Sequence, residues 1–413
     1  MRKSTLSVAA ALGAAATLAL AACSSGGGSG TSSNNNNNAS GNSSASAKGA
    51  SAICKLTNPP KSSASAPDSS APQKVSNAPS GTAVGVILPD TTSSTRYTLY
   101  DAPLLKKAFD AAGIKSDIQN AQGDTARFQS IAQSMIGEGV KVLIIDSIDA
   151  TSGAAIEQQA AKAGIKVIDY DRVNLGGSAA YYVSFDNQEV GKLQGQTLVD
   201  CLNQDGVSNP KIIMMDGGTD VDNNAVLFAK GAHQVFDPLK SSGKLTIQSE
   251  SVVKGWKTAN AAPTFNQALT AAGGQTDGVL AANDDIANAV IGVLQQNGLA
   301  GHVVITGQDS QVEGLQNILK GQQSMTIFKN VTYEANAAAK LAIALISGQD
   351  PSSMGVTFSD QQIDPKNTGL KSVLLPAQVI TYSNVEDVVT AGALKASEIC
   401  NGIQQACDKA GVK

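Results

Sequence analysis

Several short apolar runs in this sequence end in side chains that form strong hydrogen bonds. The polar residues at these ends are Asp90, Asp171, Arg172, Asp216, Asn283, Asp284, Gln308, Asp309 and Lys329. Carboxylates and amides accept hydrogen bonds from hydroxyl groups, whereas guanidinium and ammonium groups donate them. A single such residue after a strand is more often a helix cap than a ligand contact, but a series of them favours a polar binding cleft.

These residues do not form a recognisable catalytic site. The sequence has no phosphate-binding P-loop, no dinucleotide-binding glycine fingerprint after a strand and no Gly-x-Ser-x-Gly nucleophile motif. Two carboxylates across a cleft would suit a glycosidase. However, Arg172 follows Asp171 directly and Asp309 lies in a polar Gly-Gln-Asp-Ser segment, so both carboxylates are expected to be ionised. We therefore predict recognition of a hydroxylated ligand such as a sugar, with no catalytic residue and no cofactor.

Aromatic residues are scarce, which makes those near the polar candidates informative. Phe, Trp and Tyr make up 4% of the chain, and Trp256 is the only tryptophan. The apolar C–H face of a sugar packs on an aromatic ring, so Trp256 is a candidate stacking platform, with packing in the core as the alternative. Tyr97 follows Arg96 in the loop after the first apolar run and is a candidate second wall of the same site.

The elements that would position these residues alternate between strands and helices. Continuous apolar runs, of the kind found in strands buried on both faces, lie at 83–88, 141–146, 166–169, 211–216, 278–281 and 303–306. Between them, apolar residues recur every three or four positions, as in amphipathic helices. The alternation predicts an α/β fold with parallel sheets in two similar lobes, divided near Asp186–Asn187. Ligands bind at the carboxyl ends of strands in such folds.

The beginning of the chain has the composition of an export signal followed by a linker. Two basic residues precede an apolar stretch, and Leu20-Ala21-Ala22-Cys23 resembles a bacterial lipoprotein box. We expect a signal peptide at 1–22, a lipid on Cys23 and a disordered tether over the rest of 23–82. An ordinary signal peptide is the alternative. The lipid would be the only contact with the membrane and would anchor an extracytoplasmic protein to the cell membrane.

Charge and histidine content argue against two other classes of partner. The chain has 30 Lys and Arg residues against 34 Asp and Glu residues, a net charge of −4, and no basic cluster. A nucleic-acid partner is therefore not expected. The two histidines, His233 and His302, lack metal-ligand spacing, so no metal site is predicted.

The cysteines predict two disulfide bonds. After lipidation of Cys23, the remaining cysteines are Cys54, Cys201, Cys400 and Cys407, an even number that suits an oxidising compartment. Of three possible pairings we favour Cys54–Cys201 with Cys400–Cys407. Seven residues of continuous helix would separate the second pair by about 10 Å, which is too far for a disulfide. The helix must then break, and Gly402 is the candidate point. Free thiols on a continuous terminal helix are the alternative.

Several blocks of the sequence between Val84 and about Leu394 resemble one known family. The blocks are Val167–Arg172, Val183–Asn187, Val221–Ala225, Gly255–Trp256, Ala282–Asp284, Gly307–Asp309 and Met325–Lys329. In order and spacing they resemble the type I periplasmic sugar-binding proteins of ABC transporters. The resemblance implies two Rossmann-like lobes with parallel sheets joined by a three-stranded hinge, the type I periplasmic binding protein fold. The N-terminal lobe would comprise 83–186 plus 331–376, and the C-terminal lobe with the tail 187–330 plus 377–413.

The resemblance also implies a set of ligand contacts. These are Arg96, Tyr97, Asp171, Arg172, Asn224 or the less favoured Asn223, Trp256, Asn283, Asp309 and Lys329. It implies a monomeric solute-binding protein, not an enzyme, that captures a monosaccharide between its lobes and delivers it to an ABC permease. The similarity is greatest to the branch that binds D-xylose, with ribose, arabinose or glucose as alternatives. A sugar sensor that presents its ligand to a membrane receptor is the other interpretation left open.

Overall fold

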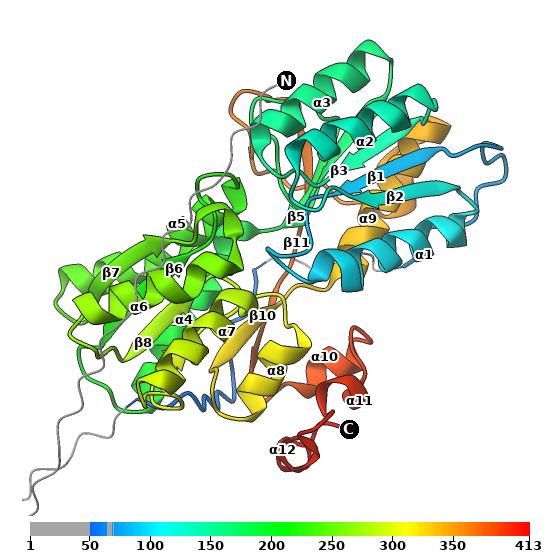
Figure 1. The fold of residues 1–413 in the computed structure, drawn as a ribbon. Coiled ribbons are helices and arrows are strands. Elements are labelled where there is room, and N and C mark those ends of the chain that lie inside the picture. Colours follow the sequence, from blue (N-terminus) through cyan, green and yellow to red (C-terminus); the bar gives the residue numbers. More distant parts are fainter. Residues whose placement is uncertain (1–49, 64–67, 69) are drawn as a thin grey trace, which may run out of the picture. The chain divides into compact units, whose positions relative to one another are not determined.

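A computed structural model of the protein describes residues 50–63, 68 and 70–413. The predicted signal peptide, the predicted lipid attachment at Cys23 and the first part of the predicted tether lie outside these residues. Two parallel sheets with helices packed against them make up most of the described chain (Figure 1). The α/β fold with parallel sheets that the sequence predicts is therefore confirmed.

The first sheet contains six strands, all parallel, in the order β11-β5-β4-β3-β1-β2. Its strands are β1 (Val84–Leu88), β2 (Ser116–Asn120), β3 (Val142–Ile145), β4 (Lys166–Tyr170), β5 (Tyr181–Phe185) and β11 (Lys371–Leu375). Successive residues of β3 enter different core clusters: Ile144 joins one, while Leu143 and Ile145 join the other. Side chains alternate across a strand, so this sheet is buried on both faces.

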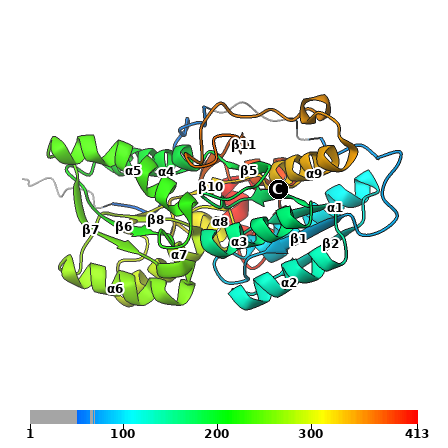
Figure 2. The same ribbon diagram turned by 90° about the horizontal axis from the view of Figure 1, so that it is seen from above.

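Helices cover both faces of this six-stranded sheet (Figure 2). The helices are α1 (Ala102–Ala112), α2 (Thr125–Gly137), α3 (Ala150–Lys162) and α9 (Val331–Ser347), with the short helices η1 (Tyr97–Asp101) and η4 (Pro351–Met354). α1 packs against α9 and α2 packs against α3. We call the six-stranded sheet with these helices the N-terminal lobe.

The second sheet contains four parallel strands in the order β7-β6-β8-β9. Its strands are β6 (Lys211–Asp216), β7 (Thr246–Val252), β8 (Gly278–Ala281) and β9 (Val304–Ile305). The accompanying helices are α4 (Asn187–Gln204), α5 (Asn223–Ser241), α6 (Ala261–Ala271), α7 (Asp284–Gln296) and α8 (Val312–Leu319), with the short helices η2 (Lys254–Trp256) and η3 (Thr258–Asn260). α4 packs against α5, and α6 packs against α7. We call this sheet with its helices the C-terminal lobe.

The chain passes between the two lobes three times. It runs from β5 into α4, from β10 (Met325–Phe328) into α9, and from β11 into β12 (Gln378–Thr381). β10 and β12 pair in an antiparallel sense, with Met325 opposite Thr381. Three crossings between two parallel sheets are what the predicted fold requires.

Helices that follow strands begin at Asp or Asn side chains. These N-terminal caps are Asp124, Asp149, Asp186, Asp222, Asn283 and Asn330. Each side chain accepts a hydrogen bond from a backbone N–H two or three residues later, which satisfies a donor that the first helical turn leaves free. The polar residues at strand ends therefore include helix caps, which is the more common role of a single polar residue after a strand.

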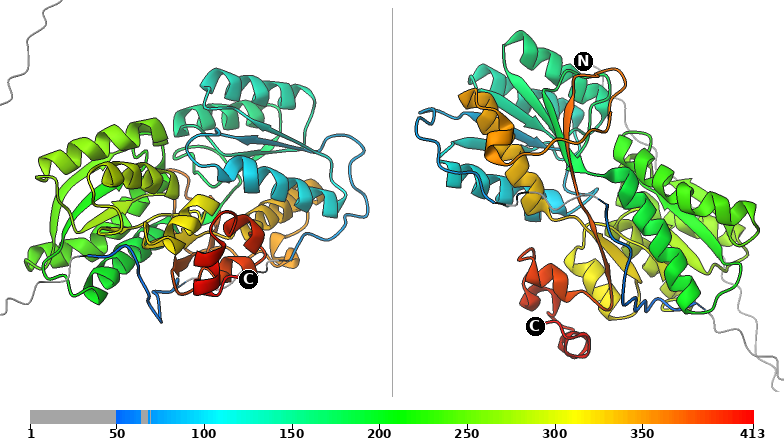
Figure 3. Two further views of the ribbon diagram at one scale, coloured as in Figure 1. Left: turned by 60° about the horizontal axis from the view of Figure 1, so that its bottom comes forward. Right: turned by 180° about the vertical axis from the view of Figure 1, so that it is seen from behind.

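The described residues from 50 to 82, which we call the leader, are attached to the body of the protein. The backbone N–H of Ala52 donates to the carbonyl of Gly301 at 3.1 Å. Cys54 is buried and forms a disulfide bond with Cys201 of α4. This part of the leader is thereby fixed to the C-terminal lobe (Figure 3).

The leader then runs past the crossing strands to the N-terminal lobe. Lys61 pairs with Gln378, the first residue of β12, in an antiparallel bridge. Further on, the backbone N–H of Val75 donates to the carbonyl of Ala112 at the end of α1, at 3.0 Å. The prediction of a disordered tether up to residue 82 is therefore wrong for these attached residues. Low hydrophobicity suggested disorder, but a covalent bond and backbone pairing hold the segment without a large apolar surface.

The chain ends in three short helices that pack on the C-terminal lobe. They are α10 (Glu386–Thr390), α11 (Ala396–Ile399) and α12 (Gln404–Ala410). Leu315 and Ile318 of α8 share a hydrophobic cluster with Ile399 and Val412. Cys400 and Cys407 form a disulfide bond across the break between α11 and α12, and Gly402 in that break has a φ of 76°.

We predict that the two disulfide bonds stabilise the protein unequally. They join residues 147 and 7 positions apart in the sequence. Because a longer closed loop restricts the unfolded chain more, loss of Cys54–Cys201 is expected to cost roughly 5 kcal/mol and loss of Cys400–Cys407 roughly 2 kcal/mol. Urea unfolding of the C54A/C201A and C400A/C407A variants measures both, each being the control for the other. Equal losses would contradict the prediction.

Candidate functional site

Nine of the ten side chains predicted to contact a ligand line one cavity between the lobes. The residues that line it are Ser93, Ser94, Arg96, Tyr97, Asp171, Arg172, Asp222, Asn224, Phe228, Trp256, Asn283, Gln308, Asp309 and Lys329. Most of them follow the carboxyl ends of strands in the two parallel sheets or lie early in the helices that come next, and Lys329 follows β10. The topology of parallel strands therefore brings together residues that are far apart in the sequence.

Asp171, directly after β4, is an ionised acceptor in this cavity. Its φ of 57° lies in the left-handed region that side-chain-bearing residues rarely adopt. Oδ1 accepts a hydrogen bond from Nη1 of Arg96 and Oδ2 accepts one from the hydroxyl of Tyr97, both at 3.1 Å. Burial opposes ionisation, but Arg96, Lys329 and Arg172 outweigh it and lower the pKa of Asp171 below its usual value.

Arg172 is held by partners from both lobes. Its Nη2 donates to Ser93 Oγ at 3.2 Å and to the Tyr97 hydroxyl at 3.1 Å. Its Nε lies 3.7 Å from carboxylate oxygens of Asp146 and Asp222. The Cζ of Arg172 is also 5.6 Å from the centre of the Tyr97 ring, within the range of a cation–π contact. Tyr97 thus helps to orient the positive charge of the site, and its predicted role as an aromatic wall stays a prediction.

Trp256 contributes a flat apolar surface among these polar groups. Its ring packs on the backbone just after β6, where a Cβ on Gly217 would come within 2.1 Å of the ring. Nε1 donates to Asp222 Oδ2 at 2.9 Å, and Phe228 meets the ring edge-on with centroids 6.4 Å apart. Only glycine leaves room for the indole at this position, so the ring orientation is fixed by the backbone beneath it.

Lys329 and Asp309 form an ion pair on the opposite side of the cavity. The Nζ of Lys329 is 3.1 Å from Asp309 Oδ1 and 3.9 Å from Asp171 Oδ1. The ammonium group therefore lies between carboxylates that belong to different lobes. It also lies 5.6 Å and 6.0 Å from the ring centres of Phe185 and Phe228. Asp309, like Asp171, has a left-handed backbone conformation, with a φ of 91°.

Side chains of the C-terminal lobe also bond directly to the N-terminal lobe around the cavity. Asn224 Nδ2 donates to the backbone carbonyl of Asp171 at 2.8 Å. Asn283 Nδ2 donates to the carbonyl of Ser93 at 2.9 Å while its Oδ1 caps α7. Asn283 is thus both a helix cap and part of the cavity wall. From the sequence alone, these two roles were alternatives.

Asn223 is the one predicted contact that does not line the cavity. It is the first residue of α5, and neighbouring helical side chains point about 100° apart, so only one of Asn223 and Asn224 can face inward. Two lining residues were missed although a signal existed for each: Asp222 caps α5, and Phe228 lies four residues after Asn224 on the same helix face. Ser93 and Ser94 were also missed, whereas Gln308 was among the strand-end polar residues but not among the predicted contacts.

Three strand-end acids, Asp90, Asp216 and Asp284, do not line the cavity. Asp284 instead accepts hydrogen bonds from the backbone N–H of Gln311 and the side chain of Gln323. Asp90 accepts hydrogen bonds from the backbone N–H groups of Thr92 and Ser93 and so shapes the loop after β1. Burial and the neighbouring Glu250 raise the pKa of Asp216 to about 7.

Two other kinds of site are absent from the described residues. No group of three or more His, Cys, Asp or Glu side chains within them is arranged to hold a metal ion. None of the described helices has the length and apolar character needed to cross a membrane.

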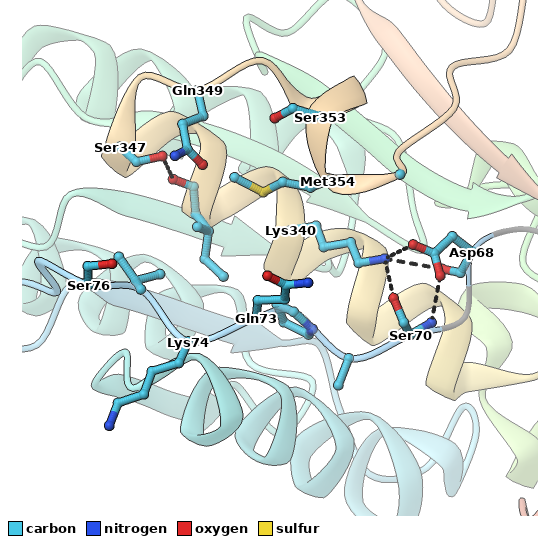
Figure 4. Close-up of a pocket in the computed structure, with 15 residues that line it drawn as sticks. Asp68, Ser70, Gln73, Lys74, Ser76, Lys340, Ser347, Gln349, Ser353 and Met354 are labelled. Atoms are coloured by element: carbon cyan, nitrogen blue, oxygen red, sulfur yellow. Dashed lines mark hydrogen bonds and ion pairs between the residues drawn. The ribbon is translucent and has the colours of Figure 1, made fainter.

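A second cavity, of about 480 Å³, lies away from these residues, between the leader and α9 with the loop that follows it (Figure 4). Lys340 of α9 projects into its wall with only 3% of the residue exposed. Its Nζ contacts Asp68 Oδ2 at 2.8 Å and Ser70 Oγ at 3.3 Å, and the hydrogen bond from Lys340 lowers the pKa of Asp68 to about 2. Because its charge is already paired, we interpret Lys340 as a fastening point for the leader.

The matching family model and two similar proteins indicate the same family. Residues 84–350 match the model of the periplasmic binding protein domain. The chain is 36% identical over 303 residues to the D-xylose-binding periplasmic protein of Escherichia coli K12, covering 72% of this chain and 87% of the relative. It is 33% identical to the protein of the same name from Haemophilus influenzae, covering 72% and 86%.

Solved structures of similar architecture include an ABC transporter solute-binding protein from Clostridium phytofermentans with bound β-D-glucose. Its TM-score is 0.69 at 29% identity, with 76% of this chain and 99% of that chain covered.

We predict that Gly217→Ala displaces the Trp256 ring. The new Cβ would overlap the indole, so the variant is expected to lose about 1–3 kcal/mol of stability and to change the emission of the only tryptophan. Gly292→Ala in α7 is the matched control, because nothing lies within 4 Å of its added Cβ, and a small gain in stability is expected. Urea unfolding followed by tryptophan emission tests both. Wild-type emission and stability in Gly217→Ala would show that the ring lies elsewhere.

Proposed function

The chain belongs to the periplasmic binding protein family, and we propose that its inter-lobe cavity binds a monosaccharide, D-xylose before other sugars. The relatives and structural neighbours found are solute-binding proteins, not enzymes, and the family is extracytoplasmic. The protein therefore captures its solute without chemical change.

The balance of charge around the cavity is the observation that carries the proposal. The basic side chains that line it are Arg96, Arg172 and Lys329, and the acidic ones are Asp171, Asp222 and Asp309. Equal formal numbers of cations and carboxylates favour a neutral ligand over an acid or an amine. A sugar hydroxyl both donates and accepts hydrogen bonds, so it suits a wall built of both kinds of partner. Its C–H face suits the ring of Trp256.

The preference for a pentose rests on the relatives. Both curated relatives described above carry D-xylose in their names, at 36% and 33% identity. Glucose, present in the structural neighbour, is the main alternative ligand.

The remaining expectations from the sequence belong to the same proposal. We propose a monomeric lipoprotein that is anchored at Cys23 and delivers its sugar to an ABC permease. We also propose lobe boundaries at 83–186 plus 331–376 and at 187–330 plus 377–413. The strands of the six-stranded sheet and those of the four-stranded sheet fall on the two sides of this division, which supports it.

Calorimetric titration of the purified protein is expected to show D-xylose binding at one site. A panel with ribose, arabinose and glucose ranks the alternatives, and recovery of unaltered sugar checks that no turnover occurs. Absence of heat with all four sugars would refute the proposal. A ranking with glucose or ribose above xylose would refute the specificity alone.

Replacing Trp256 by Ala is expected to weaken sugar binding by about 1–3 kcal/mol, because a stacking surface is lost from a desolvated site. Trp256→Phe, which keeps a flat ring, is the control and should retain most of the affinity. Sugar should also alter the emission of the wild-type protein, since this is its only tryptophan. Unchanged emission together with normal binding by the Ala variant would assign Trp256 to packing.

A further inference from the structure

Arg96 is surrounded by three carboxylates that leave it little capacity for a ligand. Nε and Nη2 donate to the two oxygens of Asp101 at 2.8 and 2.7 Å. Nη2 also donates to Glu334 Oε2 at 2.5 Å, and Nη1 donates to Asp171 Oδ1 at 3.1 Å. A guanidinium group has five N–H donors, and four are engaged here. Arg96 therefore acts on the cavity mainly through Asp171, which it holds.

The charges of this cluster do not balance. The side chains of Arg96, Asp101, Asp171 and Glu334 are each at most 6% exposed. Two other cations act on the cluster through Asp171, and both have carboxylate partners of their own. Lys329 is nearer to Asp309 than to Asp171, and Arg172 lies 3.7 Å from carboxylate oxygens of Asp146 and Asp222. Ionising every one of several buried carboxylates that share one cation costs much free energy. One of them is therefore expected to be protonated.

Hydrogen bonding identifies Glu334 as the acid that holds the proton. Asp101 accepts two bonds from Arg96 and a third from the Tyr170 hydroxyl at 2.6 Å. Asp171 accepts bonds on both oxygens. Glu334 accepts a bond on Oε2 only, whereas its buried Oε1 forms no hydrogen bond. The ionised form of Glu334 is thus the least stabilised of the three.

The electrostatic surroundings of Glu334 agree with this assignment. The titratable groups that face it are Arg96 and Asp101 from η1 and its start, Tyr170 at the end of β4, Asp171 after β4, Tyr182 of β5 and Lys329 after β10. Burial raises the pKa of Glu334 to about 8; Arg96 opposes this, and the neighbouring Asp171 and Asp101 add to it.

We propose that Glu334 is a positioning residue of the sugar site, and that its protonated form is the one that supports binding. A neutral Glu334 leaves Arg96 free to hold Asp171 at the cavity wall. An ionised Glu334 competes with Asp171 for the same guanidinium group, so that Arg96 no longer holds Asp171 at the cavity wall. Glu334 lies in the first turn of α9, immediately after a crossing between the lobes, and is not among the residues that line the cavity.

The inference rests on the proposed function and predicts how sugar affinity depends on pH. A group with a raised pKa is protonated below it, so affinity for the sugar that the wild type binds should be constant from pH 6 to 7 and fall above 8. For one proton the fall is at most tenfold per pH unit, and we expect about three- to tenfold between pH 7 and 9. Binding at pH 8.5 should then take up protons, which calorimetry in two buffers of different ionisation enthalpy measures.

Glu334→Gln, which mimics the protonated acid, should keep the affinity of pH 7 within about twofold and lose the fall at high pH. Asp216→Asn is the matched control, because it removes another buried acid of raised pKa that does not line the cavity, and it should keep the wild-type profile. A flat wild-type profile, a wild-type fall in Glu334→Gln, or loss of its binding at pH 7 would overturn the inference. If Glu334→Gln does not fold, proton uptake by the wild type still decides. No sugar binding by the wild type would instead refute the proposed function.

Discussion

Burying a charged group away from water is costly unless a group of opposite charge lies beside it. The arrangement of the side chains around the cavity follows from this requirement. Arg96 and Arg172 would be costly in the interior if carboxylates did not surround them. Parallel strands supply those partners, because each strand ends at the same edge of its sheet and carries a polar residue there. Asp171 follows one such strand and Asp309 follows another, in the other lobe. The fold therefore holds these charged groups together at one cavity between the lobes.

The walls of the cavity are also the contacts between the lobes. Ser94 Oγ donates to Asp309 at 2.9 Å and Asn283 donates to the carbonyl of Ser93, so the lobes meet through the residues that line the site. A ligand that contacted both walls would therefore favour the approach of the lobes. The leader adds a further connection, since the disulfide at Cys54 fixes it to one lobe and the contact of Asp68 with Lys340 fixes it to the other.

The strand ends, the parallel sheets and most lining residues could be predicted from the sequence, because apolar runs and the polar residues after them are local signals. The attached leader could not, since its composition resembles that of a disordered linker and its attachment depends on a partner, Cys201, far along the chain. Asn223 could not be separated from Asn224 without knowing where α5 begins. Nothing in the sequence marks Glu334, because an acidic residue in a helix is ordinarily exposed to solvent. Only its hydrogen bond with Arg96 in the folded protein reveals its role.

Backbone strain marks the same residues independently of their charges. Asp171, Trp256 and Asp309 have φ values of 57°, 56° and 91°, in a region that glycine tolerates and other residues rarely adopt. Such conformations cost of order 1–3 kcal/mol each and persist only where the surroundings over-determine them. A residue that only packs in the core would gain nothing from a left-handed backbone conformation. Replacing any of these three residues by glycine would relieve the strain but remove its side chain. Among the described residues, six that are not glycine have a positive φ; these three line one cavity, on both lobes, whereas Gln122, Asn209 and Ser310 do not line it. At the three lining residues the strain fits a role in placing the side chains at the cavity, not in stabilising the fold.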